Sequence, residues 1–176
     1  MIVKFSALLS RMASACLAAA TLLAAAPAAA AGLEVDLLEP WDGKRVPAGQ
    51  QCRLFGGDGW TPPIHVWNLP AGTVWVVDQF NNRSYKPLAR EGGHGQIAWP
   101  AKWPVTYLYP IPGMSGLPKW GAFVVEPART LGPYASPGYL PPCSGGQKHK
   151  YSVDILAVDA NGNVLDEQRN VALGKY

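Results

Sequence analysis

The stretch KYSVDILAVDANGNVLDEQRNVAL, residues 150–173, predicts a β-hairpin. Within 150–159 the apolar residues recur at every second position, which is the period of a strand with one buried and one solvated face. Asn161-Gly162 then favours a type I′ turn, because both central residues of that turn need positive φ. Residues 163–173 should return as the antiparallel partner. The expected apolar face comprises Tyr151, Val153, Ile155 and Ala157, and the expected wet face comprises Lys150, Ser152 and Asp154.

Short apolar runs between turn residues extend this pattern to the rest of the chain. Its 19 Gly and 17 Pro separate these runs, which predicts an all-β domain with long Pro/Gly-rich loops and little helix. Residues 74–77 are apolar without alternation and predict a central strand covered on both faces. Residues 99–120, rich in Pro and Trp, predict an ordered loop around the domain. The remaining expected strands are 33–38, 64–67, 73–80, 105–109 and 121–126.

Residues 1–31 have the pattern of a secretory signal peptide. Lys4 and Arg11 precede the apolar run ASACLAAATLLAAAPAAAA, and Ala29–Ala31 supply the small residues of a cleavage site. A lipoprotein signal at Cys16 and an uncleaved anchor are the alternatives. Cleavage leaves residues 32–176 as a single β domain, without a further run of about 20 apolar residues that would predict a membrane span. We therefore expect an exported protein, periplasmic or secreted.

Charge and cysteine content narrow the functions expected of this domain. Setting aside Lys4 and Arg11 reduces the 15 basic residues to 13, against 12 acidic ones, so the sequence does not predict nucleic-acid binding. Cys52 and Cys143 remain as an even pair, which favours a disulfide in an oxidising compartment. Two buried thiols or a metal pair are the alternatives, although C-x-x-C spacing is lacking, and we expect no metal site.

Three histidines are the candidates for chemistry. His65 lies mid-strand and is expected to be an ordinary half-buried residue. His94, in EGGHGQ, and His149, after CSGGQK, stand beside glycines, where free backbone N–H groups and an imidazole can cradle an anion. Two loop histidines with purely structural partners are the alternative. A nucleophilic pair of Cys143 and His149 conflicts with the expected disulfide, because an oxidised cysteine is not a nucleophile.

Four segments resemble the phosphatidylethanolamine-binding protein family, also called the Raf-kinase-inhibitor family. TPPIHVWNLPAGT (61–73) is similar to the Pro-Pro entry segment of that family, and YLPPCSGGQKHKY (139–151) to its Pro-Pro-x-Gly-x-x-His-Arg-Tyr signature. GGHG (92–95) stands where the family has its other pocket histidine, and VLDEQRNVALGKY (164–176) resembles its closing strand. The segments occur in the family's order and together cover most of residues 50–176.

The resemblance implies a Greek-key β-sandwich with a small pocket for phosphate, acetate or phosphorylated head groups. Two departures concern the pocket and its mouth. The family's Asp-Pro-Asp-x-x-Pro segment corresponds here to VVDQFNNRSY, so either Asp78 keeps one carboxylate or Asn81 and Asn82 replace both. The family's helix before the last strand is replaced by the Asn161-Gly162 turn. The ligand-binding residues implied by the resemblance are His94, His149, Tyr151, Asp78, Asn81 and Pro142.

We therefore expect an exported, non-enzymatic protein that binds a small anionic or phosphorylated ligand without a cofactor. The alternative is a secreted or periplasmic protein-interaction or inhibitor protein that uses segment 99–120 as its contact surface. A hydrolase using His94 or His149 with Asp78 is the third reading, but the sequence offers no matching nucleophile.

Overall fold

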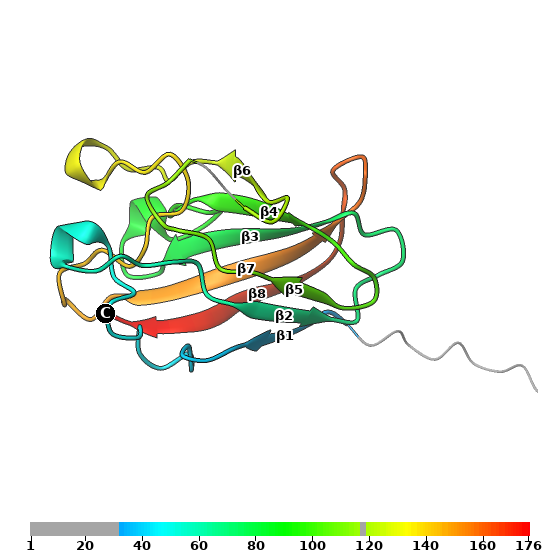
Figure 1. Cartoon of the computed structure of the whole chain (residues 1–176), viewed down its shortest axis with the longest axis horizontal. Helices are drawn as coiled ribbons and strands as arrows, with labels where there is room; N and C mark the ends of the chain where they lie inside the picture. The colour runs from blue at the N-terminus through cyan, green and yellow to red at the C-terminus, as the bar shows by residue number, and fades with distance from the viewer. Residues whose placement is uncertain (1–31, 117–118) are drawn as a thin grey trace, which may run out of the picture. The chain divides into compact units, whose positions relative to one another are not determined.

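The computed structural model describes residues 32–116 and 119–176, which belong to one compact unit (Figure 1). The predicted signal peptide, 1–31, lies outside the described residues. Two antiparallel sheets pack face to face, which confirms the all-β sandwich; the Greek-key connection stays a prediction. Within the described ranges, no helix has the length and apolar character needed to cross a membrane.

The two sheets contain three and five strands. The smaller sheet has the order β1-β2-β5, formed by β1 (Glu34–Leu37), β2 (Ile64–Trp67) and β5 (Thr106–Leu108). The larger has the order β6-β4-β3-β7-β8, formed by β6 (Phe123–Glu126), β4 (Gln96–Pro100), β3 (Trp75–Asn82), β7 (Lys150–Val158) and β8 (Val164–Lys175). Three short 3-10 turns complete the fold: η1 (Arg53–Phe55), η2 (Lys86–Leu88) and η3 (Gly132–Tyr134).

The core lies between the inner faces of the two sheets. Val66 and Leu108 from the smaller sheet meet Val76, Phe80 and Ile155 from the larger one, and all five are buried. Burial of such side chains contributes roughly 1.5–3 kcal/mol each relative to leaving them in water. The apolar run at 74–77 leads into β3, the central strand of the five, but the run is not covered on both faces as predicted. Val74 precedes the strand and is 39% exposed, and of the run only Val76 is buried.

The 150–173 hairpin forms, with one error in the prediction of its faces. Ser152 and Asp154 are buried, not solvated. The pairing of β7 with β8 is irregular between Val153 and Ile155, and there the Asn170 N–H in the middle of β8 donates to Asp154 Oδ1 at 2.7 Å while Arg169 lies 3.8 Å from Oδ2. Partners from β8 therefore replace water at Asp154, whereas the Ser152 hydroxyl is buried without a hydrogen-bond partner.

The hairpin turn also differs from the predicted type I′. Of the two central residues, Gly162 has a positive φ of 86°, whereas Asn161 is not left-handed. The Gly162 N–H donates to the Asp159 carbonyl at 3.2 Å, and the Asp159 carboxylate accepts the N–H groups of Asn161 and Asn163, each at 2.8 Å. This is a three-residue loop with glycine in the left-handed position, which the Asp159 side chain fixes.

Segment 99–120 contains, as β5, the strand predicted at 105–109, which pairs with β2 in register His65↔Tyr107. Its first two residues, Trp99 and Pro100, belong to β4, a strand that the sequence analysis did not predict, and Trp99 is buried there. His65 is half-buried, as expected, with Trp67 and Tyr107 in edge contact with its ring at 5.3 and 5.0 Å. A strand that ends at a proline gives a weak sequence signal because proline cannot donate to the ladder.

Asp78 is an anomaly in this core. It is fully buried on the inner face of β3, with Ile97 and Ile155 as its register partners, and neither carboxylate oxygen has a hydrogen-bond partner. Burial without a compensating charge raises the pKa of this carboxyl well above its ordinary value. Burial in the sandwich therefore favours the protonated, uncharged form of Asp78.

We predict that Asp78→Asn stabilises the protein increasingly as the pH rises from 5 to 8. Above the pKa of about 3.8 of an unfolded aspartate, the unfolded chain releases the proton that the native chain retains, so native stability falls with rising pH. The amide removes this dependence, with a gain of about 1–3 kcal/mol at pH 8, measured by urea unfolding. The exposed Asp58→Asn is the control; a variant destabilised equally at every pH would show that the carboxyl contributes favourably.

Candidate functional site

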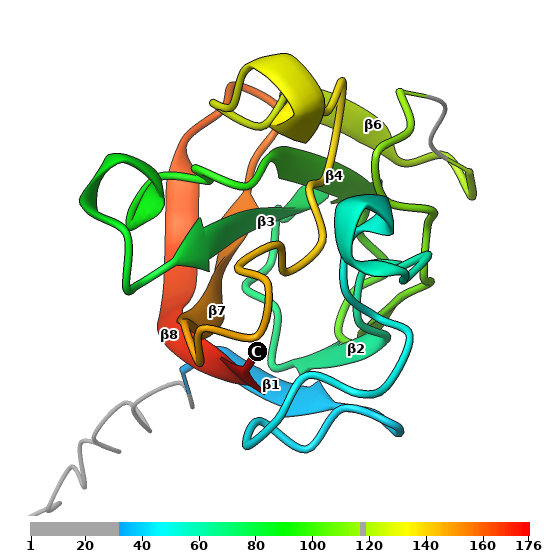
Figure 2. The ribbon, with the colours of Figure 1, turned by 90° about the vertical axis from the view of Figure 1, so that its left-hand side faces the viewer.

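A pocket of about 530 Å3 opens at one end of the sandwich, which Figure 2 faces directly. Loop 143–149 (orange) lies in the centre of this view, with the three 3-10 turns spread around it. The polar lining comprises Asn82, His94, Arg129, Thr130, Ser144, Gln147 and His149. The apolar lining comprises Phe55, Pro87, Leu88, Leu131 and Leu140, with Tyr85, Tyr134 and Cys143 at the same wall.

The last rung of the β3–β7 ladder forms one wall of the pocket. Asn82 ends β3 and pairs with Tyr151 near the start of β7, two residues after His149. Asn82 Nδ2 donates to the Tyr151 hydroxyl at 3.4 Å and lies 3.0 Å from His149 Nδ1. The ladder thus brings together His149 and Tyr151, two of the predicted site residues, with Asn82. The sequence analysis had named Asn82 only among the alternatives for the family's acidic positions.

The orientation of Asn82 fixes the tautomer of His149. Asn82 Oδ1 accepts the Ser84 N–H at 3.1 Å, so the amide must present its NH2 group to the histidine. His149 Nδ1 is therefore the acceptor, and in the neutral ring the proton is on Nε2. The half-buried His149 ring brings one N–H donor to the pocket wall.

His94 has the opposite tautomer. Its Nδ1 lies 2.8 Å from the Leu140 carbonyl oxygen, and because a carbonyl can only accept, Nδ1 carries the proton. The ring is buried, and its edge contacts Tyr151 at 5.4 Å between centroids. Burial lowers the pKa of His94 to about 4; the Leu140 carbonyl opposes this shift and nearby His149 adds to it. At neutral pH, Nε2 of His94 is therefore an uncharged acceptor.

The glycines around His94 allow two backbones to cross beneath the pocket. The His94 N–H donates to the Phe80 carbonyl, and the His94 carbonyl accepts the Leu140 N–H, both at 2.8 Å. Gly95 has a φ of 108°, and a Cβ there would lie 2.6 Å from the Gly138 carbonyl oxygen. Since no side chain fits in that space, glycine at 95 is a requirement of the crossing.

Tyr151 supports the pocket from below and is absent from its lining. It is buried, and its hydroxyl accepts the Cys143 N–H at 3.1 Å in addition to the Asn82 amide. Burial raises the pKa of Tyr151, opposed by hydrogen bonds from Ser144 and the Cys143 backbone. Its role is to position Asn82 and the loop that begins at Cys143.

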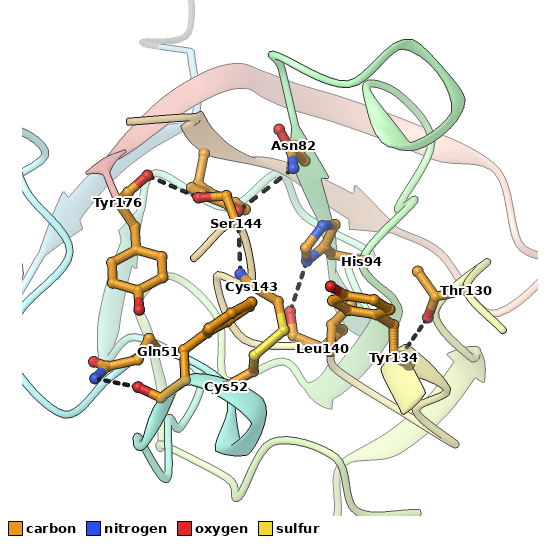
Figure 3. Close-up of a disulfide and its surroundings, with 12 residues drawn as sticks. Gln51, Cys52, Asn82, His94, Thr130, Tyr134, Leu140, Cys143, Ser144 and Tyr176 are labelled. Atoms are coloured by element: carbon orange, nitrogen blue, oxygen red, sulfur yellow. Dashed lines mark hydrogen bonds between the residues drawn. A yellow bond between two sulfur atoms is a disulfide. The ribbon is translucent and has the colours of Figure 1, made fainter. Parts of the chain in front are cut away.

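The Cys52–Cys143 disulfide forms, as predicted, and holds that loop against η1 (Figure 3). The two Cα atoms are 5.2 Å apart across a sequence separation of 91 residues. The Cys52 N–H also donates to the Pro142 carbonyl at 3.0 Å, and Ser144 Oγ donates to the Tyr176 carbonyl at 2.8 Å. The start of the loop is therefore held by these three contacts before the chain reaches His149.

Four of the six predicted ligand-binding residues do not line the pocket: Tyr151, which lies beneath it, and Asp78, Asn81 and Pro142. Asp78 lies four residues before Asn82, in the core. Asn81 projects to the opposite face of β3, where Nδ2 donates to Asp154 Oδ2 at 3.1 Å and Oδ1 accepts the Gly92 N–H at 3.0 Å. Pro142 is buried behind the rim. Strand alternation explains the difference, because 78 and 82 share a face with 80 whereas 81 does not.

Arg129 and the apolar rim were missed by the sequence analysis. Arg129 projects along the wall, donates to the Arg90 carbonyl and lies 3.8 Å from a Glu91 carboxylate oxygen. Leu131, just before η3, and Tyr134, at the end of η3, follow it in the lining. These residues come from a loop without a motif, so no local signal could have identified them.

The chemistry that this pocket offers is hydrogen bonding by two imidazoles and an arginine. Among the described residues there is no cluster of three His, Cys, Asp or Glu side chains that could hold a metal ion. Cys143 is oxidised in the disulfide, so the Cys143–His149 nucleophile pair does not form. Comparisons with protein-family models, curated proteins and solved structures gave no match.

We predict that His94 remains neutral in NMR titrations down to about pH 4. The unfolded chain takes up this proton near pH 6.5, so native stability should fall by about 3 kcal/mol as the pH drops from 6.5 to 4. His94→Gln should remove this contribution, with His65→Gln as a matched loss of a histidine outside the pocket. A His94 resonance that titrates near 6.5 would contradict the assigned tautomer and burial.

Proposed function

We propose that this chain is a non-enzymatic binding protein for a small oxyacid, namely phosphate or a phosphorylated head group. The observation that carries the proposal is the pairing of tautomers in one pocket: His94 presents a free acceptor nitrogen, and His149 presents an N–H donor. A singly protonated oxyacid matches both, because its O–H donates to one ring and its charged oxygen accepts from the other.

The pocket supports this ligand class in two further respects. Arg129 supplies a positive charge at the pocket wall, which the Glu91 carboxylate, 3.8 Å away, offsets in part. The floor is buried, so hydrogen bonds made there are stronger than the same bonds in water. The resemblance to the phosphatidylethanolamine-binding family, in which the corresponding histidines face an anion, points to the same class.

An exported location, periplasmic or secreted, forms part of the proposal. It rests on the signal-like residues 1–31 and on the disulfide, which persists in oxidising compartments. The non-enzymatic assignment rests on the pocket chemistry: Asp78 lies in the core and not in the pocket lining, and Cys143 is oxidised in the disulfide, so neither offers the group suggested for acid–base or nucleophilic catalysis.

A thermal-shift panel tests the ligand class. We expect phosphate or a phosphomonoester to stabilise the oxidised protein by about 2.7 kcal/mol at one hundred times its Kd. The shift should disappear in His94→Ala/His149→Ala and persist in His65→Ala. Comparing the shifts with acetate and glycerophosphoethanolamine to that with phosphate shows which anionic group the pocket prefers. Zn²⁺ serves as a metal control. No shift with any oxyacid, while the double variant folds normally, would reject the proposal.

A protein-interaction function is the second candidate, because segment 99–120 has exposed aromatic residues. Trp103 is 64% exposed, Trp120 60% and Tyr109 47%. Trp120 also has a φ of 63°, a strained conformation for a bulky residue, and its ring lies 5.3 Å from that of Tyr109. Partner capture that is lost in Trp103→Ser/Trp120→Ser and retained in the double histidine variant would favour this function.

A further inference from the structure

Positive charge is concentrated around the pocket end of the domain. We call the residues concerned the basic belt; all nine are exposed, and they represent most of the 13 basic residues that remain after Lys4 and Arg11 are set aside. They line the surface grooves beside the pocket. The belt comprises Lys44, Arg45, Arg83, Lys86, Arg90, Arg129, Lys148, Lys150 and Lys175.

Backbone hydrogen bonds show that the belt is continuous. The Arg83 N–H donates to the Lys150 carbonyl at 2.8 Å, and Lys150 is the register partner of Lys175 on β8. The Lys175 N–H in turn donates to the Lys44 carbonyl at 3.1 Å. These contacts join the turn after β3, the start of β7, the end of β8 and the loop after β1 into one surface.

Few carboxylates neutralise this surface. Asp42 uses its Oδ1 to accept the N–H groups of Lys44 and Arg45, at 2.8 and 3.2 Å, and Glu91 lies 3.8 Å from Arg129. Within residues 32–116 and 119–176, no other member of the belt forms an ion pair. The belt therefore has a large positive excess, although the domain as a whole is nearly neutral.

Exposed apolar side chains lie at the same end. They belong to the three 3-10 turns or directly precede them, and Figure 2 shows the backbone of these turns around loop 143–149. Leu131 is 87% exposed and Tyr85 is 51% exposed, with Leu54, Phe55 and Tyr134 at 43%, 37% and 39%. Exposed apolar groups that cluster beside unpaired cations indicate contact with a surface that is both anionic and apolar.

We propose that the pocket end docks onto an anionic phospholipid bilayer, with the basic belt over the head groups and the η1 and η3 tips in the interface. Each Lys or Arg near an anionic bilayer contributes about 1 kcal/mol, and buried apolar side chains add to this. A soluble polyanion would match the belt but would leave the apolar tips without a partner. This docking does not require the pocket to hold a ligand.

Vesicle co-sedimentation of the purified protein tests the proposal. Vesicles with one quarter phosphatidylglycerol in phosphatidylcholine should bind the protein, and pure phosphatidylcholine vesicles should not. Lys44→Ala/Lys175→Ala should weaken partitioning roughly thirtyfold, whereas Lys102→Ala/Lys119→Ala, which removes two lysines outside the belt, should leave it unchanged. Leu131→Ser should weaken it further, with Leu165→Ser as the matched control on β8.

The same assay separates docking from pocket binding and from general charge attraction. His94→Ala/His149→Ala should keep full vesicle binding, so docking stands or falls independently of the oxyacid proposal. Equal losses in the Lys44/Lys175 and Lys102/Lys119 variants would overturn the proposal. So would a lack of binding to anionic vesicles. Binding that Leu131→Ser leaves intact and that dextran sulfate abolishes would instead assign the belt to a soluble polyanion.

Discussion

The candidate site depends on the register between β3 and β7. Eight consecutive pairs run from Trp75↔Val158 to Asn82↔Tyr151, and the last of them forms the pocket wall. A slip of one residue would turn every side chain of β3 to the other face. Asn82 would then leave the pocket, and the tautomer of His149 would lose its determinant. The geometry of the site is therefore a property of the central sheet rather than of the loops alone.

The loops add rigidity to what the sheet sets in place. His94 and Leu140 exchange backbone and ring hydrogen bonds, and Cys52–Cys143 ties the next turn to η1. By loop-closure entropy, a link across 91 residues removes roughly 4–5 kcal/mol of freedom from the unfolded chain. These constraints hold two imidazoles with opposite tautomers in one pocket. Under the proposed function, such a pair would distinguish ligands by the position of the proton as well as by charge.

Local patterns in the sequence predicted most of the strands, the disulfide and the two pocket histidines. What they missed depends on contacts between distant segments. The wet face expected of β7 is covered by Arg169 and Asn170, and β4 ends in a proline that weakens its signal. The choice among Asp78, Asn81 and Asn82 required the strand to be placed in its sheet. Arg129 and the basic belt could not be predicted, because their members are scattered along the chain and become neighbours through the fold.

The crossing of the backbones at Gly95 and Gly138 has a consequence for how this fold can diverge. A Cβ at Gly95 would meet the Gly138 carbonyl at 2.6 Å, and one at Gly138 would meet the Ser115 carbonyl at 2.5 Å. Histidines that bind a ligand can be exchanged when the ligand changes, but these two glycines are fixed by main-chain geometry. During evolution, descendants of this chain would keep the glycine pair longer than the histidines. Gly95 and Gly138 would then still identify related chains after the residues that set the specificity of the pocket had changed.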